Sequence, residues 1–179
     1  MKQKVEKGFT LIETAIAIAV LAMIALAGTA VTFQALKATG QSNDRMTAIP
    51  QVQNAGYWIS RDAQMAKGIL VDNLEPPKFI ILSWKDYENG ATTHHEVTYF
   101  FEDLSGGVGK LKRNHWSSAG ADEETLIAQH IYYDPDDPDN TDNTSIANYD
   151  SPELTVRLRA LFGDASVTRE YKAVRRPNL

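Results

Sequence analysis

Gly8-Phe9-Thr10-Leu11-Ile12-Glu13 joins a short cationic leader to a long apolar segment, and the organisation of the chain follows from this junction. The leader contains Lys2, Lys4 and Lys7 against Glu6, so its net charge is positive. Positive charge beside an apolar span keeps the flanking segment on the cytoplasmic side of a membrane. We therefore expect the amino end to stay in the cytoplasm.

The apolar segment is long enough to cross a membrane. From Phe9 to Phe33 it holds about 25 residues, against the roughly 20 that a spanning helix needs, and Glu13 is its only charge. An abrupt apolar start follows the small residue Gly8, so cleavage there would remove only the leader. The expected parts are a leader peptide (1–8), a transmembrane and filament-core helix (9–36) and a globular head outside the cytoplasm (37–179).

These residues resemble the processing motif of the type IV prepilins and pseudopilins. Gly8, Phe9 and Glu13 match that motif position by position, with lysines before it and an unbroken apolar run after it. The resemblance implies that a prepilin peptidase/methyltransferase cuts after Gly8 and N-methylates the new amino terminus, Phe9. It also implies that the processed helix assembles with those of other pilin subunits.

The carboxylate of Glu13 would need a partner in the membrane, where an isolated carboxylate costs on the order of 2.5–3.5 kcal/mol. Cleavage after Gly8 would free the amine of Phe9, which is mostly protonated at neutral pH. That amine could pair with Glu13 of its own chain or of a neighbouring subunit, and the resemblance favours the neighbour. Alternatively, Glu13 lies at the membrane interface, where the dipole of a helix amino end stabilises an anion.

The remaining part of the chain, roughly 140 of 179 residues, is enough for one head with its own core. The sequence contains no cysteine, so no disulfide holds an exported head together. The formal net charge is −5, and loss of the leader (three lysines against one glutamate, +2) would leave about −7. This balance argues against a broadly basic nucleic-acid surface, so any contact with DNA would have to be local.

Helical periodicity continues beyond the apolar segment. Apolar or small residues recur at alternating steps of three and four, as in a helix that packs one face on a core. They are Ile49, Val52, Gly56, Ile59, Ala63, Ala66 and Leu70. Gly40 and Pro50 disfavour a continuous helix, so we expect a kink or brief break between two helical segments.

After Leu70 the pattern becomes that of strands, in short runs rich in strand-forming residues. The runs are 79–82, 97–101, 111–113, 127–132, 154–159 and 166–171. Turn residues at 105–107 and 163–164 predict two hairpins. Successive strands without intervening helices predict an antiparallel sheet that the long helix covers. We therefore predict an α+β, pilin-like fold, and the order of the middle strands also resembles larger minor pilins and J-type pseudopilins.

Two patterns that could indicate a catalytic or metal site fail on inspection. The glycine-rich segment 105–111 has Leu104 where a phosphate loop needs its first glycine and Leu111 where it needs serine or threonine. The histidines have no metal-ligand spacing, and no Gly-x-Ser-x-Gly motif marks a nucleophile. The four histidines are His94, His95, His115 and His130. We expect no enzymatic activity.

An acidic segment, 134–143, could supply the six to eight oxygens that calcium prefers. The candidate ligands are Asp134, Asp136, Asp137, Asp139 and Asp142. The segment has neither the turn glycine nor the closing glutamate of an EF-hand. The sequence therefore favours a solvated acidic loop without a cofactor over a bound calcium ion.

The carboxy-terminal residues are basic, with Arg169, Lys172, Arg175 and Arg176 close together. The simpler interpretation is an exposed strand and tail that protect a sheet edge. The alternative is a contact with an acidic neighbouring subunit or with DNA, which would weaken steeply with salt.

Three functions fit these features. The favoured one is a structural subunit, in the membrane and then in a type IV pilus or type II secretion-like pseudopilus; its large head and long acidic loop indicate a minor component. The second is a binding module at the tip of such a filament, an adhesin or a DNA-uptake protein. The third is a single-pass membrane protein that never polymerises.

Overall fold

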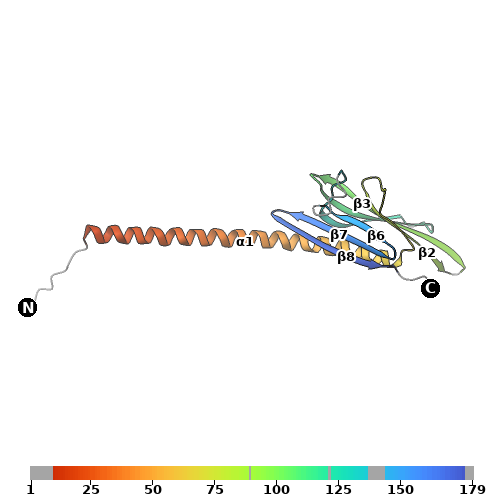
Figure 1. Cartoon of the computed structure of the whole chain (residues 1–179), viewed down its shortest axis with the longest axis horizontal. Coiled ribbons are helices and arrows are strands. Elements are labelled where there is room, and N and C mark those ends of the chain that lie inside the picture. The colour runs from red at the N-terminus through yellow and green to blue at the C-terminus, as the bar shows by residue number, and fades with distance from the viewer. Residues whose placement is uncertain (1–9, 89, 121, 137–143, 176–179) are drawn as a thin grey trace, which may run out of the picture. The chain divides into compact units, whose positions relative to one another are not determined.

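The computed structural model describes residues 10–88, 90–120, 122–136 and 144–175. Within them, one helix precedes eight strands (Figure 1). The elements are α1 (Leu11–Met65), β1 (Gly68–Leu70), β2 (Lys78–Glu88), β3 (Ala91–Ser105), β4 (Val108–Ser117), β5 (Asp122–Tyr132), β6 (Ile146–Asp150), β7 (Glu153–Phe162) and β8 (Ala165–Val174). The chain divides into two compact units, Met1–Ser42 and Asn43–Leu179, and each contains part of α1.

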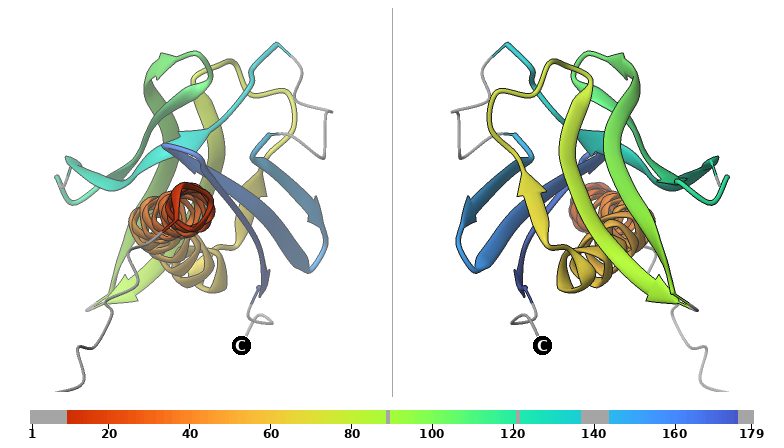
Figure 2. Two further views of the ribbon diagram at one scale, coloured as in Figure 1. Left: turned by 90° about the vertical axis from the view of Figure 1, so that its left-hand side faces the viewer. Right: turned by 90° about the vertical axis from the view of Figure 1, so that its right-hand side faces the viewer.

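The second unit, the head, is built on an antiparallel sheet in the order β1-β2-β3-β4-β5-β7-β6, with β8 paired to β7. β7 pairs with β6 along its first half and with β8 along its whole length, and it meets β5 at Ile131 and Ala160. Figure 2 shows the strands curled around the head portion of α1. This is the predicted α+β, pilin-like fold.

One face of the head portion of α1 forms the core with the inner face of the sheet. Of the predicted stripe, Val52, Gly56, Ile59, Ala63 and Ala66 are buried, and Ala48 and Ala55 join them. The absence of a side chain on Gly56 is required, because a Cβ there would overlap the ring of Tyr171 on β8. The helical periodicity therefore located the packed face correctly.

The brief break that we expected in the helix is wrong, because α1 runs through both Gly40 and Pro50. The alternative, a kink, stays a prediction. Pro50 removes the amide that would bond to the carbonyl of Met46. Both residues lie on the exposed side of α1, and Met46 is 69% exposed, so water can satisfy that carbonyl. The lost hydrogen bond therefore does not end the helix.

The predicted helical stripe was too long at its carboxyl end. The amide of Lys67 donates to the carbonyl of Ser83 on β2 at 2.8 Å, which turns the chain from the helix into the sheet. Leu70 consequently belongs to β1 and is half exposed. The two predicted hairpins are present, β3 to β4 and β7 to β8, whereas β1 and β6 were not predicted.

Candidate assembly and processing site

α1 begins with a capping box. The amide and hydroxyl of Thr10 donate to Oε2 of Glu13 at 2.9 and 3.0 Å, and the amide of Glu13 donates back to Oγ1 of Thr10 at 3.4 Å. Such reciprocal bonds satisfy amides that a helix amino end otherwise leaves without partners. Glu13 therefore holds the start of the helix in addition to carrying its charge.

Behind this cap, every described residue of the first unit is exposed. The large apolar side chains are included: Leu11 is 92% exposed, Leu26 72% and Phe33 70%. By length and composition, this part of α1 is sufficient to cross a membrane, and none of the apolar stretch is buried within the chain. Such a surface is stable only when lipid or other apolar helices cover it.

The hydroxyl groups of this segment need no outside partner. Thr14 donates to the carbonyl of Leu11, and Thr29 and Thr32 donate to carbonyls one turn earlier, at 2.8–2.9 Å. Hydroxyls bonded back to the helix are compatible with an apolar environment. Glu13 thus remains as the one ionisable side chain from Leu11 to Leu36.

Two of the predicted processing and assembly residues, Gly8 and Phe9, lie outside the described residues. Cleavage, methylation and the pairing of the Phe9 amine with Glu13 therefore stay predictions. The sequence interpretation missed Thr10. Its signal was present, since threonine followed three residues later by glutamate is the sequence pattern of a capping box.

Residues 3–29 match the family model of the prokaryotic N-terminal methylation motif. The chain is a type IV prepilin-like or pseudopilin-like protein. No curated protein and no solved structure matches it. The motif implies processing by a prepilin peptidase and assembly with other pilins in a membrane-associated filament, and it ends well before the head of this prepilin-like protein begins.

In the head, a buried ion pair joins α1 to the sheet. Asp62 on α1 is fully buried, and its Oδ2 accepts bonds from Nε of Arg113 at 2.6 Å and from the hydroxyl of Tyr99 at 2.5 Å. The guanidinium of Arg113 also lies over the ring of Trp58, 5.3 Å from its centre. Burial, and then the charge of Asp62, raise the pKa of Tyr99 well above its usual value. These bonds fix how the helix sits on β3 and β4.

Two of the four histidines, which are distant along the sequence, lie next to each other in the structure. His95 and His115 stack with Trp84 across three neighbouring strands, with Nδ1 of His95 3.1 Å from Nε2 of His115. Nε2 of His95 also lies 3.3 Å from Oδ2 of Asp86. Burial, followed by the charges of Arg113 and His95, lowers the pKa of His115. The described residues nevertheless contain no group of three or more side chains suited to holding a metal ion.

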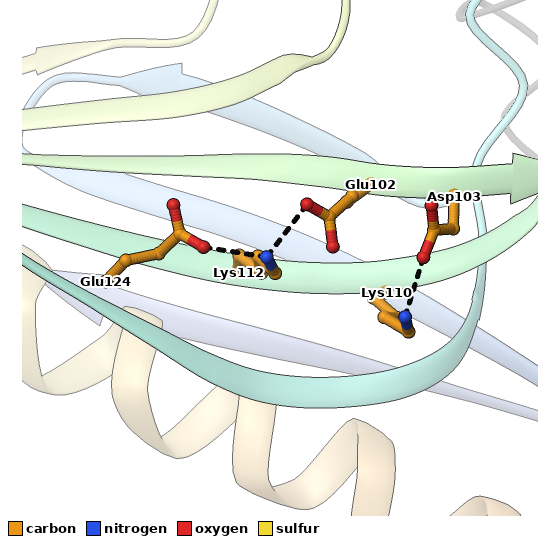
Figure 3. Close-up of polar contacts among 5 residues, drawn as sticks. All are labelled: Glu102, Asp103, Lys110, Lys112 and Glu124. Atoms are coloured by element: carbon orange, nitrogen blue, oxygen red, sulfur yellow. Dashed lines mark hydrogen bonds and ion pairs between the residues drawn. The ribbon is translucent and has the colours of Figure 1, made fainter.

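The outer face of the sheet carries a row of paired charges (Figure 3). Nζ of Lys112 on β4 lies 2.8 Å from Oε1 of Glu102 on β3 and 2.7 Å from Oε1 of Glu124 on β5. Nζ of Lys110 lies 2.6 Å from Oδ2 of Asp103. Bonds to the two glutamates raise the pKa of Lys112, so this lysine keeps its charge at any physiological pH.

The predicted calcium ligands are only partly placed. Asp137, Asp139 and Asp142 lie outside the described residues. Oδ1 of Asp134 accepts a bond from the amide of Asp136 at 3.1 Å, a local turn contact. The favoured solvated loop and the alternative of a bound calcium ion both stay untested, and melting temperatures measured with added calcium and with chelator would distinguish them.

The basic residues at the carboxy-terminal end are largely engaged within the head. Nζ of Lys172 lies 3.1 Å from Oε1 of Glu153, and Nη1 of Arg175 donates to the carbonyl of Lys67 at 2.7 Å. Arg169 is exposed, and Arg176 lies outside the described residues. β8, which carries Arg169 and Lys172, pairs with β7 on one side and forms an edge of the described sheet.

Proposed function

We propose that this protein is a minor subunit of a type IV pilus or a type II secretion-like pseudopilus. Before assembly it spans the cytoplasmic membrane once, with its head outside, and is cut after Gly8 and N-methylated at Phe9. One observation carries the proposal. Glu13 is the one ionisable side chain from Leu11 to Leu36, and it lies at the start of an apolar helical segment that is exposed along its whole length.

The exposed helix supports lateral packing with other subunits. Small residues along it allow helix backbones to approach closely in an apolar environment. They include Ala17, Ala19, Ala22, Ala25 and Gly28. Between such helices the unpaired charge of Glu13 is costly, so the amine of Phe9 on a neighbouring subunit would fix the axial register of assembly.

The capping box gives Glu13 a second role that an experiment must separate from the first. Glutamine serves at the same capping-box position as glutamate, so Glu13→Gln keeps the cap and removes the charge. Glu13→Ala removes both, and Thr10→Ala removes the capping hydroxyl while keeping the charge. The three variants therefore distinguish a helix defect from a lost ion pair.

The test uses the full chain in the cells that produce it. Mass spectrometry of the mature amino terminus measures processing, and immunoblotting of sheared filaments measures incorporation. We expect Glu13→Gln to be cleaved and methylated at Phe9 but poorly incorporated, and Thr10→Ala to be incorporated far better. Normal incorporation of Glu13→Gln would refute the role of the charge, and an intact Met1 in the wild-type protein would refute the processing.

Minor status is tested separately, by the stoichiometry of purified filaments. The large head and the long acidic loop of the sequence support a minor component, which would be present in far fewer copies than the principal pilin. If quantitative mass spectrometry found this chain as the most abundant pilin, it would be a major subunit. A location confined to one filament end would instead support the alternative of an adhesin or DNA-uptake module at the tip.

A further inference from the structure

The outer face of the sheet contains a shallow groove of about 400 Å³. Side chains alternate between the two faces of a strand. On β3, Val97, Tyr99 and Phe101 point into the core, so their neighbours face outward. The groove is lined by outward side chains of β3, β4 and the start of β5, namely Glu96, Thr98, Phe100, Asn114, Trp116 and Asp122, and by Pro77 and Lys78, where β2 begins. Lys78 is paired in register with Phe100, four residues along β3 from Glu96.

Across this groove, an exposed indole stands between two carboxylates. Trp116 on β4 is paired in register with Glu96 on β3 and with Asp122 on β5. Directly opposite residues have Cβ atoms about 4.5–5.5 Å apart, so the three side chains form one row. Trp116 is 48% exposed, and both carboxylates are exposed as well.

Neither carboxylate of this row has a partner among the described residues. A few residues away on the same face, Lys112 bridges Glu102 and Glu124 (Figure 3). Within the described residues, the sheet thus pairs a cation with some of its outer carboxylates but not with Glu96 or Asp122, and Lys78, which lines the groove beside Phe100, forms no ion pair with either. Two unpaired negative charges flank an aromatic ring whose π face itself attracts cations.

We propose that this groove binds a lysine or arginine side chain presented by an exposed segment of a partner protein. The cation would lie over the indole of Trp116 between Glu96 and Asp122, while its aliphatic stem would pack along Phe100. A neutral sugar could also stack on an exposed indole, but it would gain nothing from two unpaired charges. Charge complementarity therefore favours the basic side chain.

The proposed partner is a separate chain, and two of the described basic residues near the carboxyl end are engaged within the head. Lys172 pairs with Glu153, and Arg175 bonds to the carbonyl of Lys67. The proposal concerns only the head and is independent of how the amino-terminal helix is processed. The groove proposal can therefore fail while the assembly role of Glu13 stands, and the assembly role can fail while the groove proposal stands.

The test is a titration of the full chain in detergent micelles, followed by the indole N–H signals in NMR spectra. The chain has three tryptophans, and Trp116→Phe assigns the signal that matters. The probes are acetyl-Gly-Arg-Gly-amide, the same peptide with neutral citrulline in place of arginine, and methyl glucoside. We expect the arginine peptide alone to shift the Trp116 signal, with a dissociation constant near the millimolar range.

Isosteric variants then identify the charges. Glu96→Gln and Asp122→Asn should each weaken binding about two- to fivefold, as for exposed ion pairs, and added salt should weaken it further. Glu102→Gln is the matched control, because its carboxylate faces the same way but is bonded to Lys112, and it should leave affinity unchanged. The unchanged signals of Trp58 and Trp84 would show that each variant is folded.

Three results would overturn the proposal. Equal binding of the citrulline peptide would show that charge is not recognised, and a shift with methyl glucoside alone would show a sugar site. If about 10 mM arginine peptide did not shift the Trp116 signal, the groove would not bind a basic side chain with useful affinity.

Discussion

Nε of Arg113 lies 2.6 Å from Oδ2 of Asp62, and both side chains are almost entirely buried. The pair connects α1 with β4, and the hydroxyl of Tyr99 completes it from β3. A buried charge that loses its partner destabilises a protein strongly, whereas the complete pair can be close to neutral. Substitutions in this pair therefore test how much it contributes to the packing of α1 on the sheet.

We expect Asp62→Ala to lower the free energy of unfolding by about 3–5 kcal/mol, because it leaves the guanidinium of Arg113 buried without a counter-charge. Arg113→Met should lower the free energy of unfolding by a similar amount. The double variant should lose less than the sum of the two single losses. Urea denaturation of the full chain in micelles, followed by near-ultraviolet circular dichroism, measures the change.

The matched control is the exposed pair of Lys172 and Glu153. Exposed ion pairs contribute about 0–1 kcal/mol, so Glu153→Gln should leave the urea midpoint almost unchanged. Similar losses for Asp62→Ala and Glu153→Gln would show that the buried pair has no special role.

Tyr99 predicts how the head responds to alkaline pH. Its pKa is raised by burial and then by Asp62, so the folded state resists its ionisation. The corresponding stability is complete below the unfolded pKa of about 10 and is lost as pH rises toward the higher folded value. Tyr99→Phe should therefore flatten the fall in melting temperature above pH 10. If the variant and the wild type showed parallel alkaline curves, the hydroxyl would not be the responsible group.

Gly56 provides a test of the contact between α1 and β8. A Cβ at this position would overlap the ring of Tyr171, so Gly56→Ala should destabilise the head by about 1–3 kcal/mol despite the better helix propensity of alanine. Gly40→Ala, where no atom lies within 4 Å of the added Cβ, should cause no loss. In a Tyr171→Ala background the cost of Gly56→Ala should largely disappear, as thermal unfolding would show.

Much of this fold could be predicted from the sequence because the relevant signals are local. The periodicity of Val52, Ile59 and Ala63 marked the buried helix face, and the glycine turns marked two hairpins. The Asn89-Gly90 dipeptide was an equally local signal that was overlooked, and β2 and β3 pair directly across it, Glu88 with Ala91.

The contacts missed from the sequence depend on residues that are far apart along the chain. Asp62 and Arg113 are separated by 51 positions, and neither shows from its local sequence that it is buried. The same applies to the row formed by Glu96, Trp116 and Asp122, which exists only because of strand register. The break predicted at Pro50 was wrong for a different reason, since whether a proline breaks a helix depends on which face of the helix it occupies.

His115 predicts a loss of stability in acid. Burial, and then Arg113 and His95, lower its pKa, so the folded protein binds this proton less readily than the unfolded chain. The corresponding stability is complete above the unfolded pKa of about 6.5 and is lost as pH falls through that value toward the lower folded pKa. Between pH 7.5 and pH 5, the wild type should therefore lose more stability than His115→Gln, as urea midpoints would show.

The exposed His94 serves as the control for this effect, because it lies outside the stack of His95, His115 and Trp84. His94→Gln should keep the full acid dependence of the wild type, since it leaves the partly buried ring of His115, and its neighbours Arg113 and His95, in place. Ionisation of carboxylates away from His115 also changes stability in this range, but it should do so similarly in all three proteins. An acid dependence that persists in His115→Gln, or disappears in His94→Gln, would assign the effect to other groups.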